Sequence, residues 1–226
     1  MDPITPPFSS GSYVFGLQGQ ELTLLPDKAL YWQEQKALLV ADVHLGKAGH
    51  FRKAGIPVPG QVHWEDLQRL SLLIEAWQPK QLIILGDLFH SQINNEWLIF
   101  EQWCQAHSKL EVILVKGNHD ILPDSAYKIP NLTVQAEPWV LPPFALSHHP
   151  GSPHIHYYTL TGHLHPAIRL RGRGRQSLTL PCFYFGEKEA ILPAFGQFTG
   201  HAIVKTPASS QVFGITEDRI IPLTST

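Results

Sequence analysis

The stretch "LIILGDLFH", residues 82–90, indicates the fold class. Its first four residues are continuously apolar, which is typical of a strand buried on both faces of a parallel sheet. A polar group, Gly86-Asp87 with His90, follows where that strand should end. Because ligands of open α/β sheets bind beyond the carboxyl ends of the strands, we expect a functional site at this edge.

Helical and strand patterns alternate on both sides of this stretch. A helix is expected after "PVPG" (57–60), with apolar residues at steps of three and four and an end at Pro79. A second helix should begin near Asn95. Strands are expected at 22–25, 29–32, 37–42, 82–85 and 112–115. The order β-α-β-α-β predicts a parallel sheet with right-handed crossovers.

From Thr133 onward the pattern changes to short strands and turns. This half should form a second sheet packed on the first. The expected strands are 133–135, 144–147, 158–161, 177–184, 190–193 and 202–205, with a hairpin over 211–222. Without a linker or internal repeat, residues 1–226 are expected to form one α/β domain.

Composition excludes several classes of protein. The chain is 43% hydrophobic and 16% charged, with a net charge of −2, so it is neither disordered nor a uniformly basic nucleic-acid binder. The first ten residues do not resemble a signal peptide, and no apolar run approaches the roughly 20 residues of a membrane span. Cys104 and Cys182 lie far apart without a CxxC motif, which suits a reducing compartment. We therefore expect a cytoplasmic protein without membrane contact.

Five polar motifs follow five predicted strands. They are "ADVHLGK" (41–47), "GDLFH" (86–90), "GNHD" (117–120), "SHHP" (147–150) and "GHLHP" (162–166). Each has an ordinary alternative as a turn or a surface histidine. Taken together, however, that alternative requires five unrelated turns to collect carboxylate, imidazole and amide groups at one sheet edge.

The side chains in these motifs form a set of metal-binding groups. The oxygen and nitrogen donors are Asp42, His44, Asp87, Asn118, His148, His163 and His165. Seven donors exceed the needs of one four-coordinate zinc and suit two metals that share a carboxylate. Without a thiolate, manganese, iron, zinc, cobalt and nickel are all compatible, and we expect Mn²⁺. Two ions ~3.5–4 Å apart would activate a bridging water for in-line attack at phosphorus.

The order D-x-H, G-D-x-x-H, G-N-H-D, a later His and G-H-x-H resembles the calcineurin-like metallophosphoesterase superfamily. The resemblance implies a four-layer α/β/β/α sandwich with two mixed sheets. It places Asp42, His44, Asp87 and His165 on one metal, and Asp87, Asn118, His148 and His163 on the other. His149 is an alternative to His148, which we prefer because the superfamily's ligand often precedes x-Pro.

A closer resemblance covers almost the whole chain. "ADVHLGKAGHFRKAGIPVPG" (41–60) and "LPAFGQFTG" (192–200) are similar to the PdeM family of ligase-associated DNA damage response endonucleases. The resemblance implies a phosphodiesterase that cuts DNA during repair, associated with a DNA ligase and a helicase. The alternatives are a phosphatase or phosphodiesterase for small molecules or nucleotides, and a non-catalytic scaffold of the same fold.

Residues outside the ligand set also receive expected roles. The superfamily pattern implies that His119 stabilises the phosphate or protonates the leaving oxygen, and histidine is suited to such proton transfer near neutral pH. Asp120 would either orient His119 or cap a turn, and His90 would lie near the leaving group. Two basic stretches are expected to contact phosphates of the substrate. They contain Lys47, Arg52 and Lys53, and Arg169, Arg171, Arg173 and Arg175.

Overall fold

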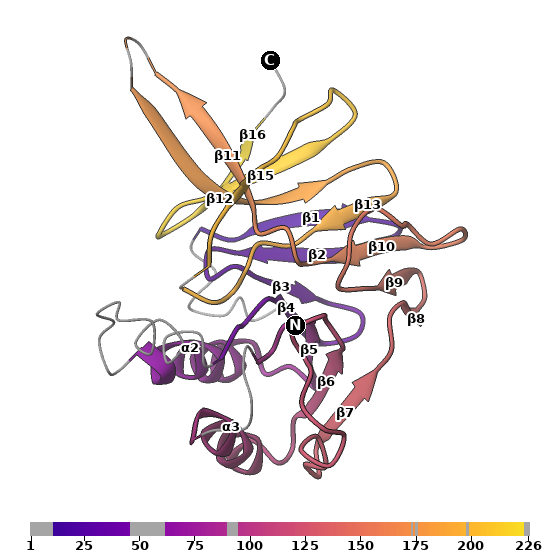
Figure 1. Ribbon diagram of the computed structural model, residues 1–226. Helices are drawn as coiled ribbons and strands as arrows, with labels where there is room; N and C mark the ends of the chain where they lie inside the picture. Colours follow the sequence, from indigo (N-terminus) through magenta and orange to yellow (C-terminus); the bar gives the residue numbers. More distant parts are fainter. Residues whose placement is uncertain are drawn as a thin grey trace, which may run out of the picture.

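The computed structural model describes residues 11–45, 62–89, 95–172, 174, 176–197 and 199–223. Two mixed β-sheets dominate, as expected from the sequence. Figure 1 shows α2 and α3 on one side of the first sheet and the second sheet on its other side.

The first sheet has the strand order β1-β2-β3-β4-β5-β6-β7. Its strands are β1 (Tyr13–Leu17), β2 (Gln20–Leu25), β3 (Ala29–Trp32), β4 (Ala37–Ala41), β5 (Gln81–Leu85), β6 (Glu111–Val115) and β7 (Leu132–Gln135). The first four pair antiparallel through short turns, whereas β4 to β7 pair in parallel. The carboxyl ends of the parallel strands therefore meet at one edge.

The continuous apolar pattern of β5 follows from its place between two layers. Leu82 and Ile84 belong to the hydrophobic core shared with the helices. Ile83 and Leu85 belong to the core shared with the second sheet. Because successive side chains of a strand point to opposite faces, both faces must be apolar for β5 to be covered on both sides.

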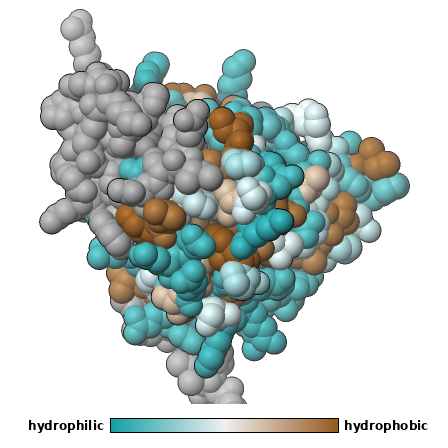
Figure 2. Space-filling view, turned by 60° about the horizontal axis from the view of Figure 1, so that its bottom comes forward, coloured by the Kyte–Doolittle hydropathy of each residue, from teal (hydrophilic) through white to brown (hydrophobic). Residues whose placement is uncertain are grey.

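Helices α2 (Val62–Trp77) and α3 (Asn95–Ala106) cover the outer face of the first sheet. Leu67 and Leu70 of α2, and Phe100 of α3, are buried there. Trp103 Nε1 donates a hydrogen bond of 2.8 Å to Ser71 Oγ, which joins the two helices. Figure 2 shows that hydrophobic and hydrophilic residues are interspersed on the face seen from the helical side. Neither described helix is long and apolar enough to cross a membrane.

The second sheet has the path β14-β11-β12-β13-β10-β9-β8, and β15 and β16 continue from β12. The strands are β8 (Trp139–Leu141), β9 (Phe144–Leu146), β10 (Tyr158–Thr161), β11 (Pro166–Arg171), β12 (Ser177–Phe185), β13 (Glu189–Ile191), β14 (Ala202–Ile203), β15 (Gln211–Ile215) and β16 (Ile220–Leu223). Strands β9, β10 and β13 pair in parallel. The loops after β9 and β10 therefore leave the same edge of this sheet.

The strands differ from the expected ones in two respects. The second sheet does not begin at Thr133, because β7 pairs in parallel with β6 and completes the first sheet. Strands β1, β8 and β11 were not expected, since exposed positions interrupt their apolar patterns. Both described helices pack on the first sheet, and the described residues supply no helix over the second sheet.

Candidate metal centre

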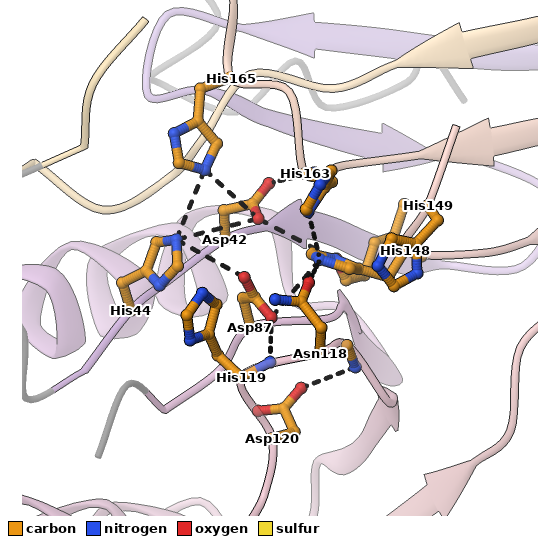
Figure 3. A network of polar contacts seen from close by, with 12 residues as sticks. Asp42, His44, Asp87, Asn118, His119, Asp120, His148, His149, His163 and His165 are labelled. Atoms are coloured by element: carbon orange, nitrogen blue, oxygen red, sulfur yellow. Dashed lines mark hydrogen bonds and ion pairs between the residues drawn. The ribbon is translucent and has the colours of Figure 1, made fainter. Parts of the chain in front are cut away.

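Loops from both sheets bring the predicted ligands together, as Figure 3 shows. Asp42 and His44 follow β4, Asp87 follows β5, and Asn118 follows β6. The second sheet supplies His148 after β9, and His163 and His165 from the loop between β10 and β11. The seven side chains therefore come from five loops, each beyond the carboxyl end of a strand.

The first cluster contains Asp42, His44 and His165, whose donor atoms lie within 4.8 Å of one another. His165 Nε2 lies 3.4 Å from Asp42 Oδ1 and 3.4 Å from His44 Nε2. Asp87 borders this cluster, because its Oδ2 lies 3.8 Å from His44 Nε2. Carboxylate and imidazole donors at this spacing could surround one metal ion.

The second cluster surrounds Nε2 of His148. Asn118 Oδ1 lies 3.1 Å from this atom, His163 Nδ1 lies 3.0 Å away and Asp87 Oδ1 lies 3.4 Å away. Asp87 thus directs Oδ1 to this cluster and Oδ2 to the first. A single carboxylate between two groups of donors is the arrangement expected for a bridging ligand.

Backbone carbonyls determine the tautomers of two imidazoles. His148 Nδ1 lies 3.0 Å from Leu85 O, and His165 Nδ1 lies 3.1 Å from Gly200 O. A carbonyl oxygen only accepts, so each Nδ1 carries a proton, and a ring without a second proton then presents the Nε2 lone pair. These lone pairs face carboxylate and amide oxygens that are also acceptors. A metal cation would satisfy such a convergence of lone pairs.

Asp42 provides a second test of whether the residues fit a metal. Its side chain is fully buried, and within the described parts of the chain Oδ1 accepts no hydrogen bond. Its Oδ2 accepts the backbone N–H of His163 at 2.8 Å. A buried carboxylate oxygen without a donor is costly unless it binds an ion. The donor set, which contains no thiolate, suits divalent transition metals.

Burial lowers the pKa of His163, and the neighbouring imidazoles of His148 and His149 lower it further. The nearby carboxylates act in the opposite direction. A lowered pKa favours the neutral ring, which is the form that binds a metal.

The backbone is strained where these side chains begin. Nine non-glycine residues of the described chain have positive φ angles, and five of them are site residues. These five are Asp42, His44, Asp87, His163 and His165, with φ between 50° and 69°. The left-handed conformation costs roughly 1–2 kcal/mol per non-glycine residue. Its concentration here indicates that the surrounding packing imposes these side-chain directions.

Gly86 and Gly162 allow the two sheets to approach each other at the site. A Cβ on Gly86 would lie 2.2 Å from His148 Nδ1, and φ is +72°. A Cβ on Gly162 would lie 2.8 Å from Asp42 Oδ2. The glycines of "GD" and "GH" are therefore required by close contact between opposing loops, which adds a structural reason to the sequence motif.

His119 lies beside the first cluster, and its ring centroid is 5.8 Å from that of His44. Its backbone N–H donates to Asp87 Oδ1 at 3.0 Å. Asp120 accepts from Gly117 N at 2.9 Å and Phe89 N at 3.3 Å, so its hydrogen bonds are those of a turn cap. Burial raises the pKa of Asp120 to about 6, although these two hydrogen bonds lower it.

The neighbouring histidines of "SHHP" occupy different environments. His148 is completely buried between the clusters, whereas His149 is exposed and its Nδ1 bonds to Glu137 Oε1. Glu137 was not identified from the sequence, since a lone glutamate before a proline has no motif. Burial tends to raise the pKa of Glu137, but hydrogen bonds from His149, Ser147 and His148 lower it to about 2.

A second feature not expected from the sequence supports the segment "LPAFGQFTG". Arg69 Nη1 donates to Phe195 O at 3.0 Å and to Asp66 Oδ1 at 2.9 Å. The Arg69 guanidinium also lies 4.2 Å from the centroid of the Phe195 ring. Phe195 N donates to Ala41 O at 2.8 Å, directly before Asp42. The backbone of this segment therefore supports the loop that carries Asp42. The sequence predicted the helix that contains Arg69, but it did not indicate that Arg69 contacts Phe195.

Some predicted residues are not brought to the clusters. Arg169 and Arg171 are exposed on β11, and Arg171 lies about 20 Å beyond His165 along an extended strand. The remaining predicted residues lie outside the described part of the chain: Lys47, Arg52, Lys53, His90, Arg173 and Arg175.

The chain is similar to a known protein family and to solved structures. The model of the calcineurin-like phosphoesterase family matches residues 36–192. The crystal structure of Pseudomonas putida nuclease MPE is 37% identical, with a TM-score of 0.78, and the match covers 94% of this chain and 100% of that one. Yfce, a phosphoesterase from E. coli, is 17% identical over 82% of this chain and 96% of its own, with a TM-score of 0.44. A comparison with curated proteins gives no match.

The family fold implies divalent metal ions, and the Asp and His clusters fit that requirement. The chain belongs to the calcineurin-like phosphoesterase family and is a metal-dependent phosphoester hydrolase.

Proposed function

We propose that this protein is a two-metal phosphodiesterase that cleaves DNA. The observation that carries the proposal is the position of Asp87, with one carboxylate oxygen toward each cluster of donors. The similarity to a nuclease of Pseudomonas putida over 94% of this chain supports a nucleic acid as the substrate.

The proposed ligands divide between two ions. Asp42, His44, Asp87 and His165 would hold one, and Asp87, Asn118, His148 and His163 would hold the other. This division is supported by the two oxygens of Asp87: His44 Nε2 lies near Oδ2, whereas His148 Nε2 lies near Oδ1. Mn²⁺ is the proposed metal, while iron, zinc, cobalt and nickel suit the same donors.

When bound, the ions would lower the pKa of a water molecule, which makes it a better nucleophile, and would neutralise charge on the phosphoryl group. His119 would donate a proton to the leaving oxygen, since its ring lies next to that of His44 and is partly exposed. Asp120 would act through the backbone: its hydrogen bonds to Gly117 and Phe89 hold the turn that carries Asn118 and His119.

The β11–β12 hairpin would extend the substrate-binding surface. Arg169 and Arg171 are both exposed, and as alternate residues of a strand they lie on one face. Arginines in such a row can contact successive phosphates, which a small substrate would not need. Lys47, Arg52 and Arg173 are proposed to contribute further contacts. A role in DNA repair with ligase and helicase partners, in the cytoplasm, rests on the resemblance to the PdeM family.

One experiment tests the proposal directly. The purified protein with Mn²⁺ is incubated in parallel with an aryl phosphate monoester, an aryl phosphodiester and DNA. We expect cleavage of the diester and of DNA, abolished by a chelator and restored by added metal. Cleavage of the monoester alone would instead identify a small-molecule phosphatase. The Asp87→Ala variant serves as a control for a contaminating nuclease.

A further inference from the structure

Glu137 lies between β7 and β8, and its carboxylate holds the loop that carries His148. Oε2 accepts hydrogen bonds from Ser147 Oγ at 2.7 Å, His148 N at 2.7 Å and His149 N at 3.0 Å. Oε1 bonds to His149 Nδ1. One side chain therefore binds the hydroxyl of Ser147, the backbone N–H groups of His148 and His149, and the ring of His149.

The loop presents two adjacent imidazoles to the same region. The donor nitrogens of His148, His149 and His163 lie within 4.8 Å of one another. Imidazoles are chemically equivalent as ligands, so composition alone does not exclude His149 from the metal. The two rings differ in their partners, because His148 Nδ1 bonds to Leu85 O inside the sandwich and His149 Nδ1 bonds to Glu137 at its surface.

We propose that Glu137 is a positioning residue that selects His148, and not His149, as the metal ligand. Its Oε2 fixes the backbone so that His148 turns inward, and its Oε1 retains His149 outside. The inference rests on the proposed two-metal site and assigns to Glu137 a role that the metal-binding motifs do not contain.

Glu137→Gln is the most informative variant. Glutamine keeps one oxygen to accept the backbone N–H groups, so the loop retains most of its support. Its amide group, however, donates where the carboxylate accepted, and it no longer fits a protonated Nδ1 of His149. Ring selection should therefore fail while the protein stays folded.

Glu189→Gln is the matched control. Glu189 Oε2 accepts Gly151 N at 2.9 Å, so it holds the same loop farther along without touching either histidine. A general loosening of this loop would affect both variants, whereas loss of ligand selection would affect only the Glu137 variant.

The measurement is the affinity and stoichiometry of Mn²⁺ by titration calorimetry, with the absorption spectrum of the Co²⁺ form as a second readout. We expect Glu137→Gln to lower the affinity for one of the two ions by roughly 10–100-fold, the range for residues that orient metal ligands. The absorption spectrum of the Co²⁺ form should also change. Glu189→Gln and His149→Ala should retain both ions. Adding His149→Ala to Glu137→Gln should restore part of the affinity, because the competing ring is removed.

Parent-like binding of both ions by Glu137→Gln would overturn the inference. An equal loss in Glu137→Gln and in the double variant would also overturn it, since Glu137 would then only support the loop. A parent protein that binds fewer than two ions would refute the two-metal site itself. A parent that binds two ions without cutting DNA would refute the proposed substrate and leave the test of Glu137 intact.

Discussion

The two sheets contribute different chemistry to the candidate centre. Loops of the first sheet supply the oxygen donors, Asp42, Asp87 and Asn118, together with His44. Loops of the second sheet supply His148, His163 and His165, which are all imidazoles. Neither set contains both the bridging carboxylate and the rings that complete the two clusters. The site therefore forms only where the sheets pack against each other.

The boundary between the sheets is held by contacts that cross it. His148 Nδ1 of the second sheet bonds to Leu85 O of the first, and His163 N bonds to Asp42 Oδ2. These bonds place second-sheet rings near first-sheet carboxylates through contacts of the protein alone. The interface between the sheets therefore orients the ligands, and a metal would complete the site.

The largest expected effect comes from removing the shared carboxylate. Asp87→Ala should lose both ions, because Oδ1 and Oδ2 face different clusters. His163→Ala, which changes a ligand from the second sheet, should weaken the binding of only one ion. Elemental analysis of folded protein, with circular dichroism as a check, measures the difference. Two tightly held ions in Asp87→Ala would contradict the bridging role of Asp87. They would also contradict the conclusion that the first sheet supplies the ligand shared by both ions.

A second prediction separates proton transfer from metal binding within the first-sheet loops. His119→Ala should keep its metal content and lose ~10²–10⁴-fold in turnover, the range for a general acid. The loss should be smaller for a substrate with an acidic leaving group, which needs no proton. Turnover is compared on aryl and alkyl phosphodiesters, and equal losses on both would remove His119 from the acid role.

A third prediction tests the boundary itself. Gly86→Ala places a Cβ 2.2 Å from His148 Nδ1, so the ring must shift and metal affinity should fall by roughly 10–100-fold. Gly19→Ala is the control, because its φ is +73° and no atom lies within 4 Å of the added Cβ. Both variants should lose about 1 kcal/mol or more of folding stability through backbone strain. Only Gly86→Ala should lose metal, as measured by titration calorimetry beside thermal unfolding.

The smallest effect is expected far from the boundary, on the β11–β12 hairpin. Replacing Arg171, Arg173 and Arg175 with glutamine should weaken DNA binding and reduce its salt dependence by about one unit of slope per lost phosphate contact. Hydrolysis of a small diester should stay unchanged, since the clusters and His119 are intact. Binding isotherms over a series of salt concentrations provide the measurement. Identical isotherms for variant and parent would show that the hairpin contributes no phosphate contact.

Much of the fold was predictable because its signals are local. The apolar run at 82–85 and the periodic stripe of α2 correctly predicted β5 and the helix that covers it. The assignment of β7 to the second sheet was wrong, since strand pairing depends on partners distant in sequence. The local sequence of residues 133–135 does not indicate which sheet they join.

The sequence by itself determined which donor atoms stand at which strand ends, because hydrophobic periodicity and motif order are written along the chain. Only the tertiary structure decided how those donors face one another. The inward turn of His148 depends on Leu85 and Glu137, and the tautomer of His165 depends on the carbonyl of Gly200. These partners are 11 to 63 residues away along the chain, and a hydrogen bond across such a separation exists only after the chain has folded.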